Sequence, residues 1–382
     1  MNAIRIDSPS WIRTAILSDI GIAAYSILES LMLSKHQATR WYAGSVCGPL
    51  IRPMPSKQAP IPNLDFFRAC AVLFVLVDHT LDKLGVKTVF GTEIQWLGRT
   101  GVLFFFVHTC CVLMMSLERH KGRHYFLNFY LRRLFRIYPL GIVAVLLAMI
   151  PPYASALTHK EWISNLLLIQ NLTFSQSALG PLWSLPIEVQ MYLFLPFVFL
   201  LARAPKTIWP ILGLFAISIP IALWETHHLA RASVLYYVPD FLPGTLAYWI
   251  YRHYNPILPN WTLPLTICVV TTAFMADPNW TFSAWFACLT LGFLVPLTRQ
   301  IQNRRVNWVA FHIAKYSFGI YLGHSLLLRW IPMSWAVLPV YLICVAAVSV
   351  ASFHFVEEPM IRFGQRLTAD PVPSGIEERV GK

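Results

Sequence analysis

Charged residues are scarce in this chain of 382 residues: Asp, Glu, Lys and Arg make up only 13%, whereas about a quarter is usual in soluble domains. The apolar share is high, at 56%, and the mean hydropathy is +0.55. These values argue against an ordinary soluble domain and indicate several membrane spans. The 14 Trp and 15 Tyr fit this interpretation, because both residue types concentrate where helices meet the membrane surface.

Motifs for metal or disulfide chemistry are also missing. Most of the seven cysteines lie inside apolar runs and none forms a C-x-x-C pair, so neither a zinc site nor a disulfide framework is indicated. We therefore expect no bound metal and no resident cofactor. The first 40 residues lack the unbroken apolar core and cleavage site of a signal peptide, so no cleaved leader is expected.

The N-terminal segment differs from the rest of the chain. Residues 11–33 predict a weakly amphipathic helix, which a proline-rich linker follows. We predict an extension with this linker over residues 1–60, a membrane domain over residues 61–366 and a cytoplasmic tail over residues 367–382. Met54 directly precedes the first long apolar run, which raises the hypothesis that translation starts there.

Apolar runs long enough to cross a bilayer recur after residue 63. We expect ten of them, at roughly residues 64–82, 98–117, 137–154, 185–202, 208–224, 236–252, 262–276, 282–299, 313–330 and 336–356. No repeat of 20 to 50 residues is visible. The predicted fold class is therefore all-α: a polytopic transmembrane helix bundle of about ten spans.

The distribution of Lys and Arg among the connections predicts how the chain is oriented. One side of the membrane receives 13 of them: Arg119, Lys121, Arg123, Arg132, Arg133, Arg136, Arg203, Lys206, Arg252, Arg299, Arg304, Arg305 and Lys315. The other side receives five: Lys83, Lys87, Lys160, Arg231 and Arg329. Cytoplasmic loops carry the excess, so both termini are expected in the cytoplasm. The formal net charge of +12 then reflects topology, and the expected partner is the lipid bilayer rather than a nucleic acid.

The first predicted span contains FRACAVLFVLVDHT, residues 67–80, with ionisable groups that a lipid-facing helix would not carry. Arg68 and His79 are 11 residues apart, which corresponds to about 16 Å of helix rise and to nearly the same face. We expect both to face the protein interior or a wet cavity. The alternatives are an arginine that reaches the membrane surface and a hydrogen-bonded structural histidine.

A second basic group lies in RRLFRIYP, where Arg132 and Arg136 are four residues apart and share a helix face, with Arg133 beside them. Clustered guanidinium groups bind phosphate in a bidentate manner. A stop-transfer cluster and contacts with anionic lipid head groups are the open alternatives.

The fourth predicted span begins with PLWSLPIEVQMYLFLPF. Ser184 predicts an N-cap and Pro186 a first-turn proline, which places Glu188 one turn from the outer surface. An acid stabilised by the helix dipole is the structural alternative. The ninth span carries His324 in its outer half, so we expect Glu188, His324 and His79 at the same depth, with His108 of the second span near mid-depth.

Six motifs occur in a fixed order: NLDFFRACAVLFVLVDHT, GVLFFFVHT, RRLFRIYP, LWSLPIEVQMYLFLP, YSFGIYLGH and HFVEEPMIRFG. Together, over about residues 63–366, they resemble the acyltransferase family 3 membrane proteins. The resemblance implies an integral membrane enzyme that transfers acyl groups other than amino-acyl groups, often acetyl, from acyl-CoA. Its acceptors are sugars or other molecules outside the cytoplasm, so O-acetylation of a polysaccharide at the cell inner membrane is expected.

The resemblance also implies roles for single residues. Arg68 and His79 match the family's arginine–histidine pair, and Glu188 matches the acid of its W-S-L-x-x-E motif. Arg132, Arg133 and Arg136 match its cytoplasmic arginine cluster, and His324 matches the histidine after its Y-x-x-Y/W-like stretch. One departure stands out: where the family usually has F-F-x-x-S-G, this chain has Phe105-Phe106-Val107-His108-Thr109-Cys110.

The expected catalytic residues are His79, as the general base, and Glu188. Glu188 or, less well placed, Asp78 would hold the tautomer of His79. The expected donor-phosphate ligands are Arg68, Arg132, Arg133 and Arg136, and the expected pocket residues are Asp78, His108, Trp183, Ser184 and His324. Direct transfer and an acyl-histidine intermediate both stay open. The alternative function is a transporter or flippase for a glycan or lipid-linked precursor, although internal repeats and broken helices are not found.

Overall fold

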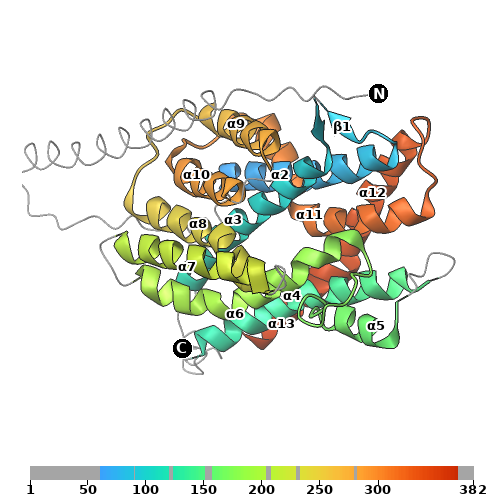
Figure 1. Ribbon diagram of the computed structural model, residues 1–382, viewed down its shortest axis with the longest axis horizontal. Coiled ribbons are helices and arrows are strands. Elements are labelled where there is room, and N and C mark those ends of the chain that lie inside the picture. Colours follow the sequence, from blue (N-terminus) through green and yellow to red (C-terminus); the bar gives the residue numbers. More distant parts are fainter. Residues whose placement is uncertain are drawn as a thin grey trace, which may run out of the picture. The chain divides into compact units, whose positions relative to one another are not determined.

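The computed structural model describes residues 61–89, 91–119, 124–150, 157–203, 208–228, 233–278 and 282–368. The predicted extension over residues 1–60 and nearly all of the predicted tail lie outside these ranges. The described part is almost entirely helical, and one short pair of strands accompanies the helices (Figure 1). The all-α fold class is therefore confirmed.

The helices follow the order of the apolar runs. Their bounds are α2 Pro62–Lys83, α3 Gln95–Arg119, α4 Tyr125–Ala148, α5 His159–Leu166, α6 Ser184–Arg203, α7 Trp209–His228, α8 Val234–His253, α9 Thr262–Ala276, α10 Ser283–Leu297, α11 Arg304–Trp330, α12 Leu338–Ser352 and α13 Glu358–Leu367. A 3-10 turn, η1 Gly180–Trp183, leads into α6, and a π-helical turn, η2 Phe353–Glu357, joins α12 to α13. The antiparallel strands β1 Thr88–Val89 and β2 Thr92–Glu93 connect α2 with α3.

Local sequence sets several helix ends. Thr158 and Glu161 form a capping box at the start of α5, in which each side chain bonds the other residue's backbone N–H. The side chain of Ser233 caps α8, and that of Asn303 caps α11. Pro62 opens α2, where its missing N–H costs no helical hydrogen bond.

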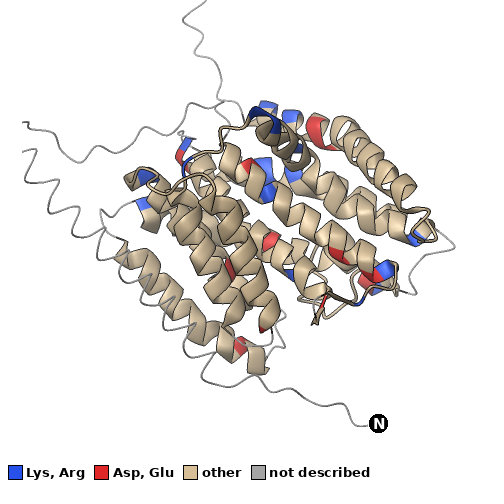
Figure 2. Cartoon of the chain, turned by 90° about the horizontal axis from the view of Figure 1, so that it is seen from above, with Lys and Arg blue, Asp and Glu red and all other residues tan. Residues whose placement is uncertain are grey.

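A helix lies at each of the ten predicted apolar runs, but the number of spans is not confirmed. By length and composition, four segments of the described chain can cross a membrane: Gln95–Arg119, Gly180–Arg203, Trp209–His228 and Leu338–Leu367. Helices α9 and α10 are apolar but shorter. Charged side chains are few along the helices, and several basic segments lie together toward the upper edge of the view in Figure 2. The count of ten spans stays a prediction.

The helix at the third predicted span, residues 137–154, begins before the apolar run from which that span was predicted. Helix α4 begins at Tyr125 and ends at Ala148, and it passes through Pro139 without ending. Arg132, Arg133 and Arg136 are therefore part of this helix. The apolar run begins only after these arginines, so hydropathy alone gave too late a start.

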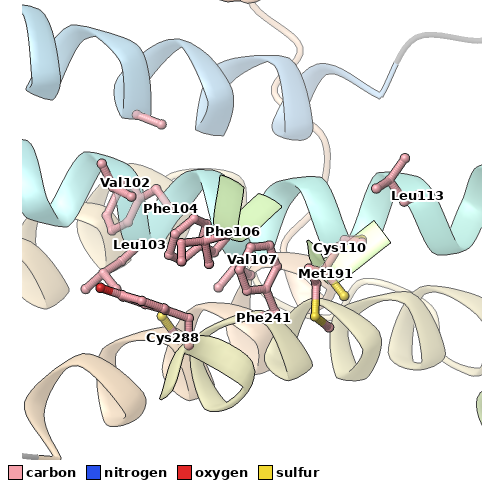
Figure 3. Close-up of a cluster of buried hydrophobic side chains, with 14 of the residues drawn as sticks. Val102, Leu103, Phe104, Phe106, Val107, Cys110, Leu113, Met191, Phe241 and Cys288 are labelled. Carbon is pink, nitrogen blue, oxygen red and sulfur yellow. The ribbon is translucent and has the colours of Figure 1, made fainter. Parts of the chain in front are cut away.

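Helix α3 contributes much of the hydrophobic core and packs against α2, α6, α8, α9 and α10. Figure 3 shows its side chains Val102 to Leu113 beside Phe241 of α8 and Met191 of α6. Two glycines permit the close approach: a Cβ at Gly101 would collide with the backbone of α2, and one at Gly244 of α8 would collide with the backbone of α3. At these two positions the helix backbones therefore pack so closely that only glycine fits.

Helices α2 and α11 run in the same direction and are joined at two heights. Arg68 bonds Ser317 near the first half of both helices, and His79 bonds His324 further along both. This parallel pair positions the residues of the candidate site.

Candidate active site

A polar cavity of about 90 Å³ lies between helices α2, α3, α4, α6 and α11. Its polar lining consists of Arg68, His108, Thr109, Arg133, Arg136, Ser184, Glu188, Tyr192, Ser317 and Tyr321. Its apolar lining consists of Val102, Phe105, Phe106, Val112, Leu113, Ile137, Leu185 and Phe318. Three guanidinium groups face one carboxylate in this small space, so positive charge is in excess there and an anionic ligand would suit the cavity.

Each cavity arginine is held differently. Arg68 donates from Nε to the buried Ser317 hydroxyl at 2.6 Å. Arg136 forms an ion pair from Nη1 to Glu357 Oε2 at 3.2 Å. Arg133 lies with Cζ 5.9 Å from the ring centre of Phe129, and its buried Nε has no hydrogen-bond partner among the described residues. Arg133 therefore has a donor left over for a ligand.

The fourth predicted phosphate ligand, Arg132, does not line this cavity. It donates from Nε to Thr368 Oγ1 at 2.6 Å and from Nη2 to the Thr368 carbonyl at 3.2 Å. It lines a much smaller hollow together with Arg133, Ser116 and Phe129. The structure thus brings three of the four arginines together and directs Arg132 to the end of α13.

Glu188 lies among the arginines, as a cavity-lining carboxylate that accepts a hydrogen bond from the Tyr192 hydroxyl one turn later. No hydrogen bond joins Glu188 to His79 among the described residues, and the Nδ1 atom of His79 lies against His324 instead. The sequence gives the depth of a residue along its own helix, but it does not give the direction in which the side chain points. The partner of His79 could therefore not be predicted.

The two histidines of α2 and α11 form a stacked pair. His79 Nδ1 lies 2.9 Å from His324 Nε2, and the ring centres are 5.1 Å apart at an interplanar angle of 15°. His324 Nδ1 lies 2.8 Å from the Ile320 carbonyl oxygen, which can only accept. The hydrogen-bond network therefore assigns the proton of His324 to Nδ1 and makes its Nε2 the acceptor. His79 must then donate from Nδ1, which leaves its Nε2 unprotonated and able to act as a base.

The surroundings of this Nε2 atom are polar on one side. Asp78 Oδ2 lies 3.8 Å away, beyond hydrogen-bond distance but close enough to stabilise a positive charge on the ring. The side chain of His79 is 38% exposed, whereas His324 is fully buried. His79 is therefore only partly enclosed by the helices.

The histidine pair adjoins the cavity without lining it. Tyr321, which lines the cavity, has its ring centre 6.3 Å from that of His324. Its hydroxyl lies 2.7 Å from the Ser184 hydroxyl, and it also donates to the Pro181 carbonyl at 3.0 Å. The N-cap expected from Ser184 is not found: α6 continues from η1, and the Ser184 hydroxyl bonds Tyr321 and Pro181 instead.

Of two other predicted pocket residues, one lines the cavity and the other does not. His108 is buried and lines the cavity, and its Nδ1 has no hydrogen-bond partner within the described chain. Trp183 does not line the cavity. Its ring lies 4.8 Å from the Arg99 guanidinium carbon in a cation–π contact, and Tyr237 lies 5.4 Å from the same carbon.

Sequence reasoning missed Ser317, Tyr321, Tyr192 and Glu357. Ser317, Tyr321 and His324 lie four and three residues apart, so helical spacing places all three on one face of α11. Tyr192 likewise follows Glu188 by one turn. The signal for Glu357 was an acid within a long apolar helix.

The apolar helices and the buried polar cavity define a membrane protein with a functional interior site. A family model described as an acyltransferase domain, that of acyltransferase family 3, matches residues 61–354. The chain belongs to this family, and it is an acyltransferase embedded in the membrane. Comparisons with curated proteins and with solved structures gave no match. Among the described residues, no group of three His, Cys, Asp or Glu is arranged to hold a metal ion.

Proposed function

We propose that the protein transfers an acyl group, acetyl in the first instance, from acyl-CoA at the cytoplasmic face to a hydroxyl of a sugar or polysaccharide. The observation that carries this proposal is the cavity of an acyltransferase-family membrane domain, in which three arginines surround a small space. Behind one wall of that space lies a histidine with a free ring nitrogen.

The donor would bind through its phosphates. Arg68, Arg133 and Arg136 offer guanidinium groups on the cavity wall, and the unpartnered Nε of Arg133 supplies a donor that no described protein group uses. A cavity of about 90 Å³ is small beside the roughly 300–1,000 Å³ of sites that enclose a whole ligand of drug size. Only part of acyl-CoA would fit, so its adenosine would stay outside while a phosphate meets the arginines.

His79 would act as the general base. Its Nε2 removes the proton of the acceptor hydroxyl while the hydroxyl oxygen attacks the thioester carbonyl. The new C–O bond forms, the C–S bond breaks, and the CoA thiolate leaves and takes up the proton from His79. His324 holds the reactive tautomer through the Nδ1 bond, the role first expected of Glu188. Asp78 stabilises the imidazolium that forms for an instant.

The bond between Tyr321 and Ser184 lies on the way from the cavity to the histidine pair. We infer that the acyl end of the donor passes this point when the Tyr321 side chain rotates. Glu188 and Tyr192 would not perform proton transfer with His79; their carboxylate–hydroxyl pair partly neutralises the arginines.

Acetyl-CoA labelled with ¹⁴C in the acetyl group tests this proposal in membranes from cells that express the full chain. Wild-type protein should transfer label to the polysaccharide fraction, and His79→Ala should lower that rate by roughly 10²- to 10⁴-fold. His312→Ala is the matched control, because His312 is a half-buried histidine of α11 that lies several turns before His324 and does not line the cavity. Label that reaches no acceptor, while a glycan precursor still crosses the membrane, would instead indicate transport.

A further inference from the structure

The C-terminal helical segment contains one irregular turn. Helix α12 continues through the π-helical turn η2 into α13, and Pro359 lies near the start of α13. Proline has no N–H for the preceding turn, so the helix widens locally to accommodate it. An extra residue in one turn rotates the following side chains by about 100°. Two neighbouring acids, one at the end of this turn and one at the start of α13, point to different surroundings.

Glu357 points inward and Glu358 outward. The Glu357 side chain is fully buried, and its described partner is Arg136, at 3.2 Å between Oε2 and Nη1. Glu358 is partly exposed and pairs with Arg362 at 2.8 Å and His354 at 3.1 Å along the same helix. Burial of a carboxylate costs free energy unless a positive group faces it. Arg136 supplies that positive group for Glu357.

The ion pair is not needed to attach α13 to α4. Phe135 and Phe363 pack edge to face at 5.1 Å between ring centres, and Gly364 lies directly against Phe135. Arg132 adds two hydrogen bonds to Thr368. These contacts already hold the two helices together, which leaves a different role for the buried pair.

We propose that Glu357 is a positioning residue of the donor site, which holds Arg136 so that its guanidinium group faces the cavity. This inference rests on the proposed function, in which Arg136 binds a donor phosphate. A guanidinium group has five N–H donors on three nitrogens, and Glu357 faces one terminal nitrogen at 3.2 Å as an ion pair without hydrogen-bond geometry. The other two stay available to a phosphate. Without the carboxylate, the Arg136 side chain would have to be ordered at the moment of binding.

The test uses the purified full chain in detergent and acetyl-CoA as the probe. Glu357→Gln should raise the Kd and KM for acetyl-CoA about tenfold while kcat changes less than about twofold. Glu358→Gln is the matched control, since it removes a neighbouring carboxylate outside the cavity and should leave both constants unchanged. In an Arg136→Gln background, Glu357→Gln should add less than about twofold, because the residue acts through Arg136.

Three results would overturn the inference. They are a Glu357→Gln variant that binds acetyl-CoA like wild type, a fall in kcat at constant KM, and a full additional effect in the Arg136→Gln background. If Glu357→Gln does not fold, Glu357→Asp replaces it; this variant keeps the charge but withdraws it by one methylene, and an unchanged KM there would also overturn the inference. A wild-type protein that binds no acetyl-CoA would overturn the proposed function itself.

Discussion

Replacing His324 by Leu gives the sharpest test of the histidine pair. The change removes the Nε2 acceptor that lies 2.9 Å from His79 Nδ1 and puts an apolar side chain in the buried position. His79 itself, its exposure and its neighbour Asp78 stay in place. Any loss of activity then reports on the control of His79 by His324.

The size of the loss follows from the bond that is lost. During transfer the ring of His79 becomes positively charged, and a hydrogen bond to a charged group contributes about 1.5–3 kcal/mol. We expect kcat to fall roughly 10- to 150-fold, since each 1.36 kcal/mol corresponds to a factor of ten. His324→Gln keeps an oxygen acceptor near Nδ1 and should lose less. The KM for acetyl-CoA should hardly change, because the arginines of the cavity are untouched.

The assay measures kcat and KM for acetyl transfer by purified variants with matched size-exclusion profiles. His312→Leu is the control, because His312 also lies on α11 and also bonds the carbonyl four residues earlier, at 2.8 Å, but it belongs neither to the cavity nor to the histidine pair. Full kcat in a correctly folded His324→Leu variant would refute the proposed tautomer control. An equal loss in His312→Leu would show a general effect on the helix.

Three further predictions concern other parts of the chain. Arg133→Gln should raise the KM for acetyl-CoA about tenfold in the same assay, whereas Arg132→Gln, which lies outside the main cavity, should change it less. Gly244→Leu should prevent correct folding, seen as loss of the monodisperse size-exclusion peak, because its side chain would collide with the backbone of α3. Hydrogen bonds from Thr158 lower the pKa of Glu161, so its contribution to the stability of α5 is present above the unfolded pKa of about 4.3 and is lost as the pH falls through the folded value. The protection of the α5 amides against exchange, measured relative to the intrinsic rate at each pH, should therefore fall in acid, and Glu161→Gln should remove that dependence.

The positions of the helices could be predicted from the sequence because long apolar runs and the caps between them are local signals. The start of α4 could not, because its arginines interrupt the apolar pattern while still being compatible with a helix. The number of spans stays open for a related reason: α2, α4 and α11 carry the ionisable residues of the site, and these lower the hydropathy on which such a count depends.

Several residues of the candidate site could be predicted from the sequence, but which of them lie together could not. Arg68 and Glu188 were named, but the contact of Glu188 with the arginines and the pairing of His79 with His324 depend on which helices are neighbours. The packing of α2 against α11 cannot be inferred from the sequence of either helix alone. Glu357 required the π-helical turn to point inward, and a helical wheel with a regular period would have misplaced it.

The parallel arrangement of α2 and α11 also limits how the two helices can move. They are joined at Arg68–Ser317 and again at His79–His324, so neither helix can slide along or turn about its axis without breaking one of the two bonds. The separation along α2 between Arg68, the proposed phosphate ligand, and His79, the proposed base, is thereby set by the backbone, at about 16 Å of helix rise. Under the proposed function, the protein would select its acyl donor by the length of the arm between phosphate and thioester. Other parts of the donor would contribute less to this selection.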